Sequence, residues 1–160
     1  MKLVIAAVGR LKDGPERELL DRYMKRLSQS GRGLGLAPVE MLETPEGRAD
    51  TAALRQADEA ARLLKLTSTC DVLIALDENG RAMSSRAFAV QIAKYRDGGA
   101  QGVALLIGGA DGHGDAVLAK AALKLSLGAM TLPHGLARIV LAEQLYRATT
   151  ILAGHPYHRD

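Results

Sequence analysis

The sequence predicts an α/β fold, a mostly parallel sheet with helices on both faces, from two observations. Short aliphatic runs, among them LVIAAV at 3–8 and VALLI at 103–107, lack the polar alternation of half-exposed strands and therefore predict strands covered on both faces. Longer segments with an apolar residue every three or four positions separate these runs and predict the connecting helices. Because no repeat or linker interrupts the 160 residues, we expect one domain over 1–160.

The first half of the chain is expected to hold two strands and two helices. Pro15 suits the first turn of a helix and Gly31 lies just past the end of the same periodic segment. Pro38 cannot donate a ladder hydrogen bond, so the strand around it is expected at an edge of the sheet. The expected elements are a strand at 3–8, a helix at 15–30, a strand at 36–42 and a helix from Asp50 or Thr51 to about 66.

The second half continues the alternation and ends in a long helix. Ser84 or Ser85 can cap a helix that Gly98 and Gly99 end. The last helix is apolar almost all round, which predicts that it is buried. The expected elements are strands at 72–76, 103–107 and 129–132, and helices from 84 or 85 to 97, at 115–123 and at 135–152.

The charge of the chain is mildly positive and concentrated near its start. The formal net charge is +3, and residues 1–32 hold eight Lys or Arg against four Asp or Glu. This excess suits a polyanionic partner. The first helix also allows two i,i+4 ion pairs, Glu18 with Arg22 and Asp21 with Lys25, so a solvated, self-paired helix face would explain the same charges.

The composition favours a cytoplasmic protein. No small-residue cleavage site adjoins the first apolar run, so we expect no signal peptide. No apolar run approaches the roughly 18 residues of a membrane span, so we expect no membrane contact. The single cysteine, Cys70, cannot form an internal disulfide, and its place at the head of an apolar run predicts a packed thiol in a reducing compartment.

Three of the predicted strands lead into loops of unusual composition. These loops read LDENG from Leu76, GGADGHG from Gly108 and LGAMTLPHG from Leu127. Ligands of open parallel sheets bind at the carboxyl ends of the strands, so the three loops are candidates for one binding site. None of them matches G-x-G-x-x-G or carries G-K-[ST], which disfavours a dinucleotide fold and a Rossmann-type methyltransferase. Tight turns between strand and helix would also explain the glycines.

Five segments together resemble a known family. They read KLVIAAVGRLK, VLIALDENGRAMSS, LLIGGADG, MTLPHGLARIVLAEQLYRA and PYHRD. The chain resembles the bacterial large-subunit ribosomal RNA methyltransferase H family of the SPOUT superfamily. The resemblance runs from end to end of the chain but is loose over about 31–66. The resemblance implies a C-terminal part tied in a trefoil knot, a rare exception among folds. It also implies a homodimer that uses S-adenosylmethionine (AdoMet) to methylate N3 of a pseudouridine in the 23S rRNA of the assembled ribosome.

The same resemblance implies which residues contact AdoMet, and these residues fall on the three loops singled out above. Small residues in the third loop are acceptable there, because contacts from the backbone do not depend on side-chain size. The implied contacts are Leu76, Gly108, Leu127, Gly128, Ala129, Met130, Thr131 and Leu132.

Methyl transfer from AdoMet needs no protein nucleophile, but the base must be positioned and its N3 proton removed. The candidates for these roles are His134, Glu143, Arg147, Tyr157, His158 and Arg159, of which His134, Tyr157, His158 and Arg159 are preferred. We expect the tail, residues 155–160, to close the active site: Tyr157 would stack on the target base, His158 would contact it or accept the proton, and Arg159 would hold phosphate. A turn-capping or core role is the alternative for His134.

Other polar residues near the C-terminus have simpler explanations. Glu143 and Arg147 are four apart on the last helix and predict a structural ion pair, whereas Arg138 is a candidate for phosphate contact. His155 and His158 lie three apart, but no further ligands accompany them, so we expect no metal site.

Two alternatives accompany this prediction. An enzyme of the same fold could modify another RNA such as tRNA, or a ribosome-binding factor could share the fold without activity. The intact glycine-rich loop and tail argue against the second alternative. Because the chain has no separate RNA-binding domain, a second subunit would supply the missing surface across a two-fold interface.

Overall fold

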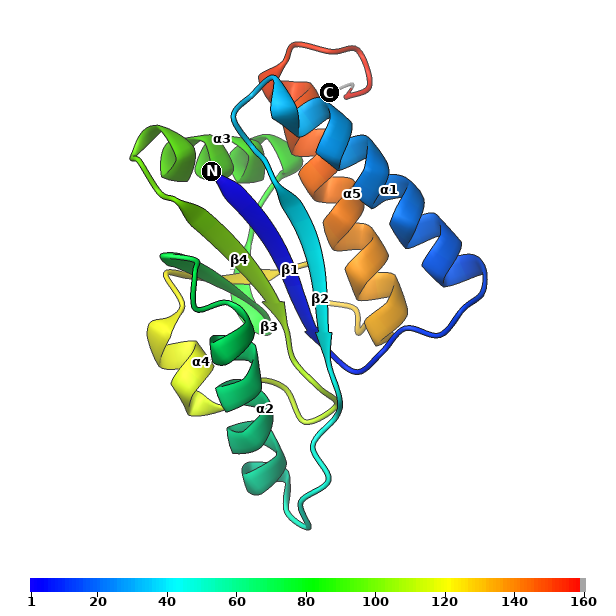
Figure 1. The fold of residues 1–160 in the computed structure, drawn as a ribbon, viewed down its shortest axis with the longest axis vertical. Helices are drawn as coiled ribbons and strands as arrows, with labels where there is room; N and C mark the ends of the chain where they lie inside the picture. The colour runs from blue at the N-terminus through cyan, green and yellow to red at the C-terminus, as the bar shows by residue number, and fades with distance from the viewer. Residues whose placement is uncertain (159–160) are drawn as a thin grey trace.

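The computed structural model describes residues 1–158 and contains a five-stranded, all-parallel sheet in the order β2-β1-β4-β3-β5 (Figure 1). Helices connect successive strands, so the predicted α/β fold is confirmed. In chain order the elements are β1 Lys2–Val8, α1 Pro15–Arg32, β2 Val39–Thr44, α2 Ala52–Leu66, β3 Val72–Ala82, α3 Ser85–Asp97, β4 Gly102–Ile107, α4 Asp115–Lys120, β5 Leu123–Ser126 and α5 His134–Leu152.

Helices cover both faces of the sheet and explain why its central strands lack polar residues. One core cluster joins Leu3 and Ile5 of β1 to α1, α3 and α5, and the other joins Val4 and Ala6 to α2 and α4. Figure 1 shows α2 and α4 on one side of the sheet and α1 and α5 on the other. Every residue of β4 is buried, as its aliphatic sequence predicts.

Local signals in the sequence place several element ends correctly. β2 lies at an edge of the sheet, as Pro38 just before it predicts. The side chain of Thr51 accepts a hydrogen bond from the N–H of Leu54 at 3.3 Å, and Ser84 accepts one from Ala87 at 3.1 Å. These two residues are therefore the N-caps of α2 and α3.

The last strand lies earlier in the chain than predicted. β5 precedes the 129–132 segment, which forms a loop, so the strand expected there is wrong. The physical reason is that the N–H of Ala122 donates to the carbonyl of Leu73 at 2.8 Å, so the chain begins to pair with β3 soon after α4. Gly128 then adopts a φ of +129°, which favours glycine and takes the chain away from the sheet.

Candidate functional site

A cavity of about 450 Å³ opens at the carboxyl ends of β3, β4 and β5, and we call it the strand-end cavity. Residues 76–79 of β3, the loops at 108–113 and 127–132, and His134 at the start of α5 line it. The strand predicted at 72–76 does not end at Leu76: β3 continues to Ala82, because after a register shift between Leu76 and Arg81 it pairs again with β5. The structure thus brings together all the residues for which the sequence implies AdoMet contact: Leu76, Gly108, Leu127, Gly128, Ala129, Met130, Thr131 and Leu132.

The second loop, residues 108–114, is the glycine loop, and its backbone forms a tight turn. The N–H of Gly112 donates to the carbonyl of Gly109 at 2.9 Å, and Gly112 has a φ of +80°. A Cβ on Gly108 would lie 3.0 Å from the carbonyl carbon of Gly112, so the two halves of the turn approach too closely for a side chain. The glycines are therefore needed where the backbone itself forms the cavity wall.

The third loop leaves β5 through a short hydrogen-bonded turn. The hydroxyl of Ser126 donates to the carbonyl of Gly128 at 3.2 Å and accepts from the N–H of the same residue at 3.2 Å. Met130 is 85% exposed, although the sequence of this segment is apolar. A large apolar side chain exposed beside a cavity is typical of a surface that binds a ligand or a second chain.

His134 is the predicted catalytic residue that borders the strand-end cavity. It is the first residue of α5, its side chain is exposed, and the N-cap position belongs to Pro133. No hydrogen bond joins its ring to any residue of 1–158. The alternative roles of turn cap and core histidine therefore do not apply, and both ring nitrogens of His134 are available to a substrate.

His113 is a cavity residue to which sequence analysis gave no role. Its side chain is 8% exposed, its Nε2 lies 3.1 Å from the carbonyl oxygen of Leu106, and within the described chain its Nδ1 has no hydrogen-bond partner. Burial lowers its pKa below the usual 6.5. A neutral imidazole that donates to Leu106 ties the end of the glycine loop to β4. Its position inside GGADGHG was the only signal in the sequence.

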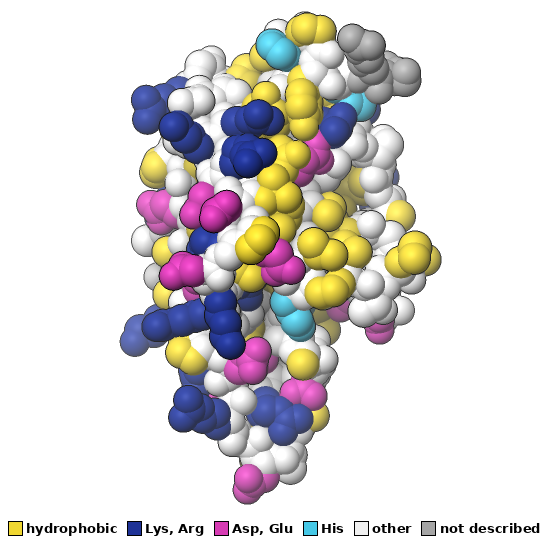
Figure 2. Space-filling model, turned by 90° about the vertical axis from the view of Figure 1, so that its right-hand side faces the viewer, with side chains coloured by type: hydrophobic (Ala, Val, Ile, Leu, Met, Phe, Trp, Pro, Cys, Tyr) yellow, Lys and Arg dark blue, Asp and Glu magenta, His cyan; other side chains and the backbone are white. Residues whose placement is uncertain are grey.

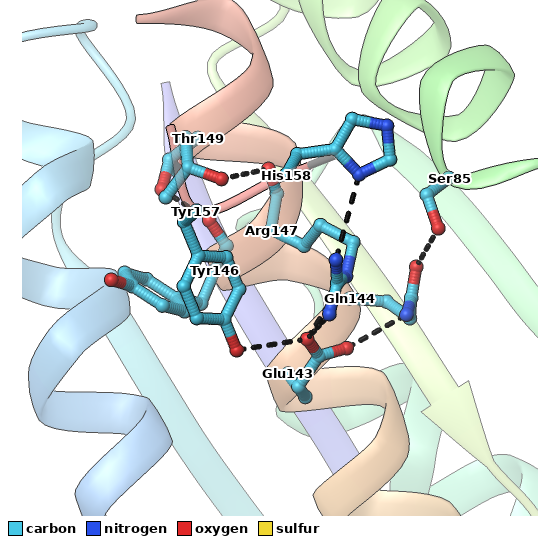
Figure 3. Close-up of polar contacts among 9 residues, drawn as sticks. Ser85, Glu143, Gln144, Tyr146, Arg147, Thr149, Tyr157 and His158 are labelled. Carbon is cyan, nitrogen blue, oxygen red and sulfur yellow. Dashed lines mark hydrogen bonds and ion pairs between the residues drawn. The ribbon is translucent and has the colours of Figure 1, made fainter. Parts of the chain in front are cut away.

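The described part of the tail folds back onto α5 (Figure 3). The hydroxyl of Tyr157 donates to Glu143 at 3.2 Å, and its ring packs edge-on against Tyr146 with centroids 4.8 Å apart. The guanidinium of Arg147 lies 5.0 Å from the Tyr157 ring centre, and its Nη1 is 3.5 Å from Nδ1 of His158. Arg147 also forms the predicted ion pair with Glu143 at 2.6 Å. Burial and the negative charge of Glu143 raise the pKa of Tyr157 to about 12.

The tail and the strand-end cavity of one chain lie apart. Neither Tyr157 nor His158 is among the residues that line the cavity. Their anchor Glu143 is nine residues along α5 from His134, which corresponds to about 13 Å at 1.5 Å per helical residue. In Figure 1 residues 155–158, in red, lie at the opposite end of α5 from its first turn. The predicted phosphate contact of Arg159 lies outside the described residues.

Arg138, a candidate for phosphate contact in the sequence, is instead buried and paired within the chain. Its side chain is 2% exposed, and its Nη1 pairs with Glu43 at 2.9 Å. Its Nη2 donates to the carbonyl oxygens of Val8 and Gly9 at 2.7 and 2.9 Å. Arg138 therefore joins the first turns of α5 to the carboxyl ends of β1 and β2.

The basic side chains of α1 are less self-paired than predicted. Among the ion pairs within residues 1–158, none joins Glu18 to Arg22 or Asp21 to Lys25, and Arg17 pairs instead with Glu43 at 2.9 Å. Figure 2 views the side of the molecule where α1 and α5 lie and shows a band of hydrophobic side chains with Lys and Arg clusters beside it. This face therefore combines apolar surface with positive charge.

Cys70 shows no features of a reactive thiol, and the described residues show no metal-binding site. Cys70 is partly buried against the second core cluster, and burial raises the pKa of its thiol, as a packed cysteine requires. Over residues 1–158 no three side chains of His, Cys, Asp or Glu gather as a metal-binding group. No helix in this part of the chain has the length and apolar character needed to cross a membrane.

A parallel α/β fold with a glycine-walled cavity at the carboxyl ends of its strands defines a protein that binds a small ligand at the strand ends. The family described as "Predicted SPOUT methyltransferase" matches residues 1–158, so the chain belongs to the SPOUT methyltransferase family and is an enzyme of that class. Its sequence is 55% identical over 159 residues to "Ribosomal RNA large subunit methyltransferase H" of Xanthobacter autotrophicus, which covers 99% of both chains. A protein of the same name from Brucella anthropi is 52% identical over 160 residues and covers 100% of both chains.

One solved structure supports the fold independently. A protein of Haemophilus influenzae, described as "a probable methylase family protein", superimposes with a TM-score of 0.53 at 12% sequence identity. The match covers 99% of this chain and 70% of the other chain. At this identity the similarity bears on the fold alone.

Proposed function

We propose that this enzyme transfers a methyl group from AdoMet to N3 of a pseudouridine in the 23S rRNA of the assembled ribosome, in the cytoplasm. The names of the full-length relatives support large-subunit rRNA as the substrate. The single observation that carries the proposal is that all the residues implied in AdoMet contact line one cavity. One SPOUT domain over 1–160 and a C-terminal trefoil knot belong to the same proposal.

The strand-end cavity fits AdoMet in size and chemistry. Its volume of about 450 Å³ falls in the range of small-molecule sites, roughly 300–1,000 Å³. Backbone amides and carbonyls of the glycine loop and of 127–132 suit hydrogen bonds to a flat heterocycle. The carboxylates of Asp77 and Glu78 line the same cavity and suit a ligand that carries positive charge.

His134 is the residue that we assign to the N3 proton. AdoMet supplies an activated methyl group, so the chain has to orient the base, exclude water and remove one proton. His134 borders the cavity, is exposed and has a ring without partners in the described chain. A neutral imidazole has one unprotonated ring nitrogen, which can accept the proton of a weakly acidic ring nitrogen.

We further propose a homodimer in which the tail of one chain lies at the strand-end cavity of the other. Within one chain Tyr157 and His158 pack on α5 and do not line the strand-end cavity, so the proposal places them at the cavity of another chain. The hydrophobic band on the α1 and α5 side (Figure 2) offers a surface for such a contact. Leu136, near the start of α5, is 41% exposed. Sedimentation of an active monomer would contradict this arrangement.

Nucleoside mass spectrometry separates the proposal from its alternatives. Ribosomes that lack the modification, and bulk tRNA, are incubated with the enzyme and AdoMet, and the digested RNA is analysed. We expect N3-methylpseudouridine from 23S rRNA and no new nucleoside from tRNA. Methylation of tRNA would favour the first alternative, and the absence of both methylation and calorimetric AdoMet binding would favour a non-catalytic ribosome-binding factor.

A further inference from the structure

The helix α2, on the face of the sheet opposite α1, α3 and α5, holds the glycine loop through side-chain contacts. This loop has four glycines in seven residues and lines the strand-end cavity. A segment of that composition has many backbone conformations available to it, so a fixed shape needs anchors. The anchors come from three residues in the first half of α2: Arg55, Gln56 and Glu59.

Arg55 holds the tip of the loop through its side chain. Its Nε donates to one carboxylate oxygen of Asp111 at 2.7 Å and its Nη2 to the other at 3.1 Å. Its Nη1 donates to the carbonyl oxygen of Ala49 at 3.0 Å, which joins the preceding loop to the same point. These hydrogen bonds lower the pKa of the Asp111 carboxyl. The paired, two-pronged geometry fixes orientation as well as distance.

Gln56 contacts the main chain of Asp111. Its Nε2 donates to the carbonyl oxygen of Asp111. Two neighbouring residues of α2 thus fix both the side chain and the backbone of Asp111, at the turn where Gly112 takes its positive φ. The turn has little freedom to rotate while both contacts are in place.

Glu59 supports the start of the loop. Its side chain is buried at 5% exposure, and its Oε1 accepts from the N–H of Gly47 at 2.7 Å. Its Oε2 has no hydrogen-bond partner within the described chain and packs directly against Gly109, where a Cβ would come within 2.5 Å of it. The carboxylate therefore fills the space behind Gly109 and sets how far the loop can recede.

None of these α2 residues lines the strand-end cavity. They contact the glycine loop on the surface that faces α2, whereas residues 108–113 of the loop line the cavity. Any influence that they have on a ligand in the cavity must therefore pass through the position of the loop.

We propose that Arg55, Gln56 and Glu59 are positioning residues that hold the glycine loop in the shape that receives the methyl donor. This inference rests on the proposed function, in which the cavity binds AdoMet. A loop that is ordered before binding loses less conformational freedom when the ligand arrives. Loss of an anchor should therefore weaken AdoMet binding and raise the KM for AdoMet, and should leave kcat at saturating AdoMet unchanged.

The test compares two arginines of α2. Calorimetry gives the Kd for AdoMet of the wild type and of Arg55→Ala, and we expect binding about tenfold weaker in the variant. Arg55→Lys keeps the positive charge but cannot donate to both carboxylate oxygens of Asp111 in the same way, so its Kd should lie between those of the wild type and Arg55→Ala. Arg62→Ala is the matched control, because Arg62 pairs with Asp58 and donates to the carbonyl oxygen of Pro45 at 3.0 Å without contacting the glycine loop.

The outcomes separate this inference from the proposed function. Wild-type Kd in Arg55→Ala would overturn the inference, and so would an equal loss in Arg62→Ala, which would mean that α2 is merely destabilised. A fall in kcat at saturating AdoMet would also overturn it, because a positioning role acts on binding. If the wild type itself fails to bind AdoMet while it is folded, the proposed function is wrong and the inference falls with it.

Discussion

Tyr157 donates a hydrogen bond from its hydroxyl to Glu143, 3.2 Å away and 14 residues earlier in the chain. The same carboxylate accepts from Arg147 and from Gln144, and Gln144 in turn accepts from the hydroxyl of Ser85 on α3 at 2.7 Å. One partly buried carboxylate thus connects Tyr157, α5 and α3 (Figure 3). The docked tail is a built feature of the chain rather than a frayed end.

Removal of the tail tests whether it acts on substrate. Deletion of 155–160 is expected to abolish methyl transfer to ribosomes and to leave the calorimetric Kd for AdoMet nearly unchanged, because the contacts proposed for Tyr157 and His158 are with the target base and not with AdoMet. Methylation at the normal rate by the truncated enzyme would contradict the proposed role of the tail.

Tyr157 should titrate late. Burial and the charge of Glu143 raise its pKa to about 12, against 10 for an ordinary tyrosine. Between these values the unfolded chain releases the phenolic proton and the folded chain keeps it, so stability falls as pH rises above 10. Tyrosine ionisation is followed by ultraviolet absorbance, and the titration curve of Tyr157→Phe is subtracted from that of the wild type. The difference should show one group with a pKa of about 12, and Glu143→Gln should lower that pKa. A group titrating near 10 in this difference would be the opposite result.

Gly109→Ala should disturb the glycine loop. The added Cβ would lie 2.5 Å from Oε2 of Glu59, whose carboxylate is fixed by Gly47. Overpacking of this kind costs about 1–3 kcal/mol of stability, and displacement of the loop should weaken AdoMet binding. Gly33→Ala is the control, since Gly33 has an ordinary φ of −67° and open space around it. Chemical unfolding and calorimetry measure both effects, and identical results for the two variants would refute the expectation.

His113 should give the enzyme an acid-sensitive contribution to stability. Burial lowers its pKa below 6.5, so the unfolded chain takes up a proton on this residue more readily than the folded chain does. The folded state therefore loses stability as pH falls below about 6.5 toward the folded pKa. His113→Gln keeps a donor for Leu106 but cannot titrate. The melting temperature of the variant should fall less steeply with decreasing pH, and equal slopes for both proteins would show that His113 contributes nothing.

Arg138 should be among the costliest side chains to remove. Arg138→Met leaves the carbonyl oxygens of Val8 and Gly9 without their donor and Glu43 with one cation fewer. Breaking a buried pair on one side costs about 3–5 kcal/mol, which urea unfolding would detect. Arg96→Met removes a more exposed pair with Asp97 together with one hydrogen bond to the carbonyl oxygen of Leu34, and should cost clearly less, about 1 kcal/mol. Similar losses in the two variants would argue against the buried network.

The strands and caps could be predicted because their signals are local. Aliphatic runs without polar alternation placed β1, β3 and β4, and single residues such as Thr51 and Ser84 marked helix starts. The last strand could not be placed in this way. LKLS reads as the end of a helix and AMTL as a strand, and a tertiary contact, the bond from Ala122 to β3, decides between them.

The strand-end loops could be predicted as a site, but their supports could not. The carboxyl ends of parallel strands meet at one edge, so three loops distant in sequence were expected together. Arg138 and Glu43 are 95 residues apart, and Arg55 and Asp111 are 56 apart, so no spacing rule links them. For this reason Arg138 stood in the sequence as a candidate for phosphate contact, although its partners are Glu43 and the carbonyl oxygens of Val8 and Gly9.

A crystal structure of the enzyme with AdoMet bound is the most direct test of the central claim. The account predicts AdoMet in the strand-end cavity, surrounded by Leu76, Gly108 and residues 127–132, with its methyl group open toward His134. AdoMet bound elsewhere on the molecule, with these residues untouched, would contradict it.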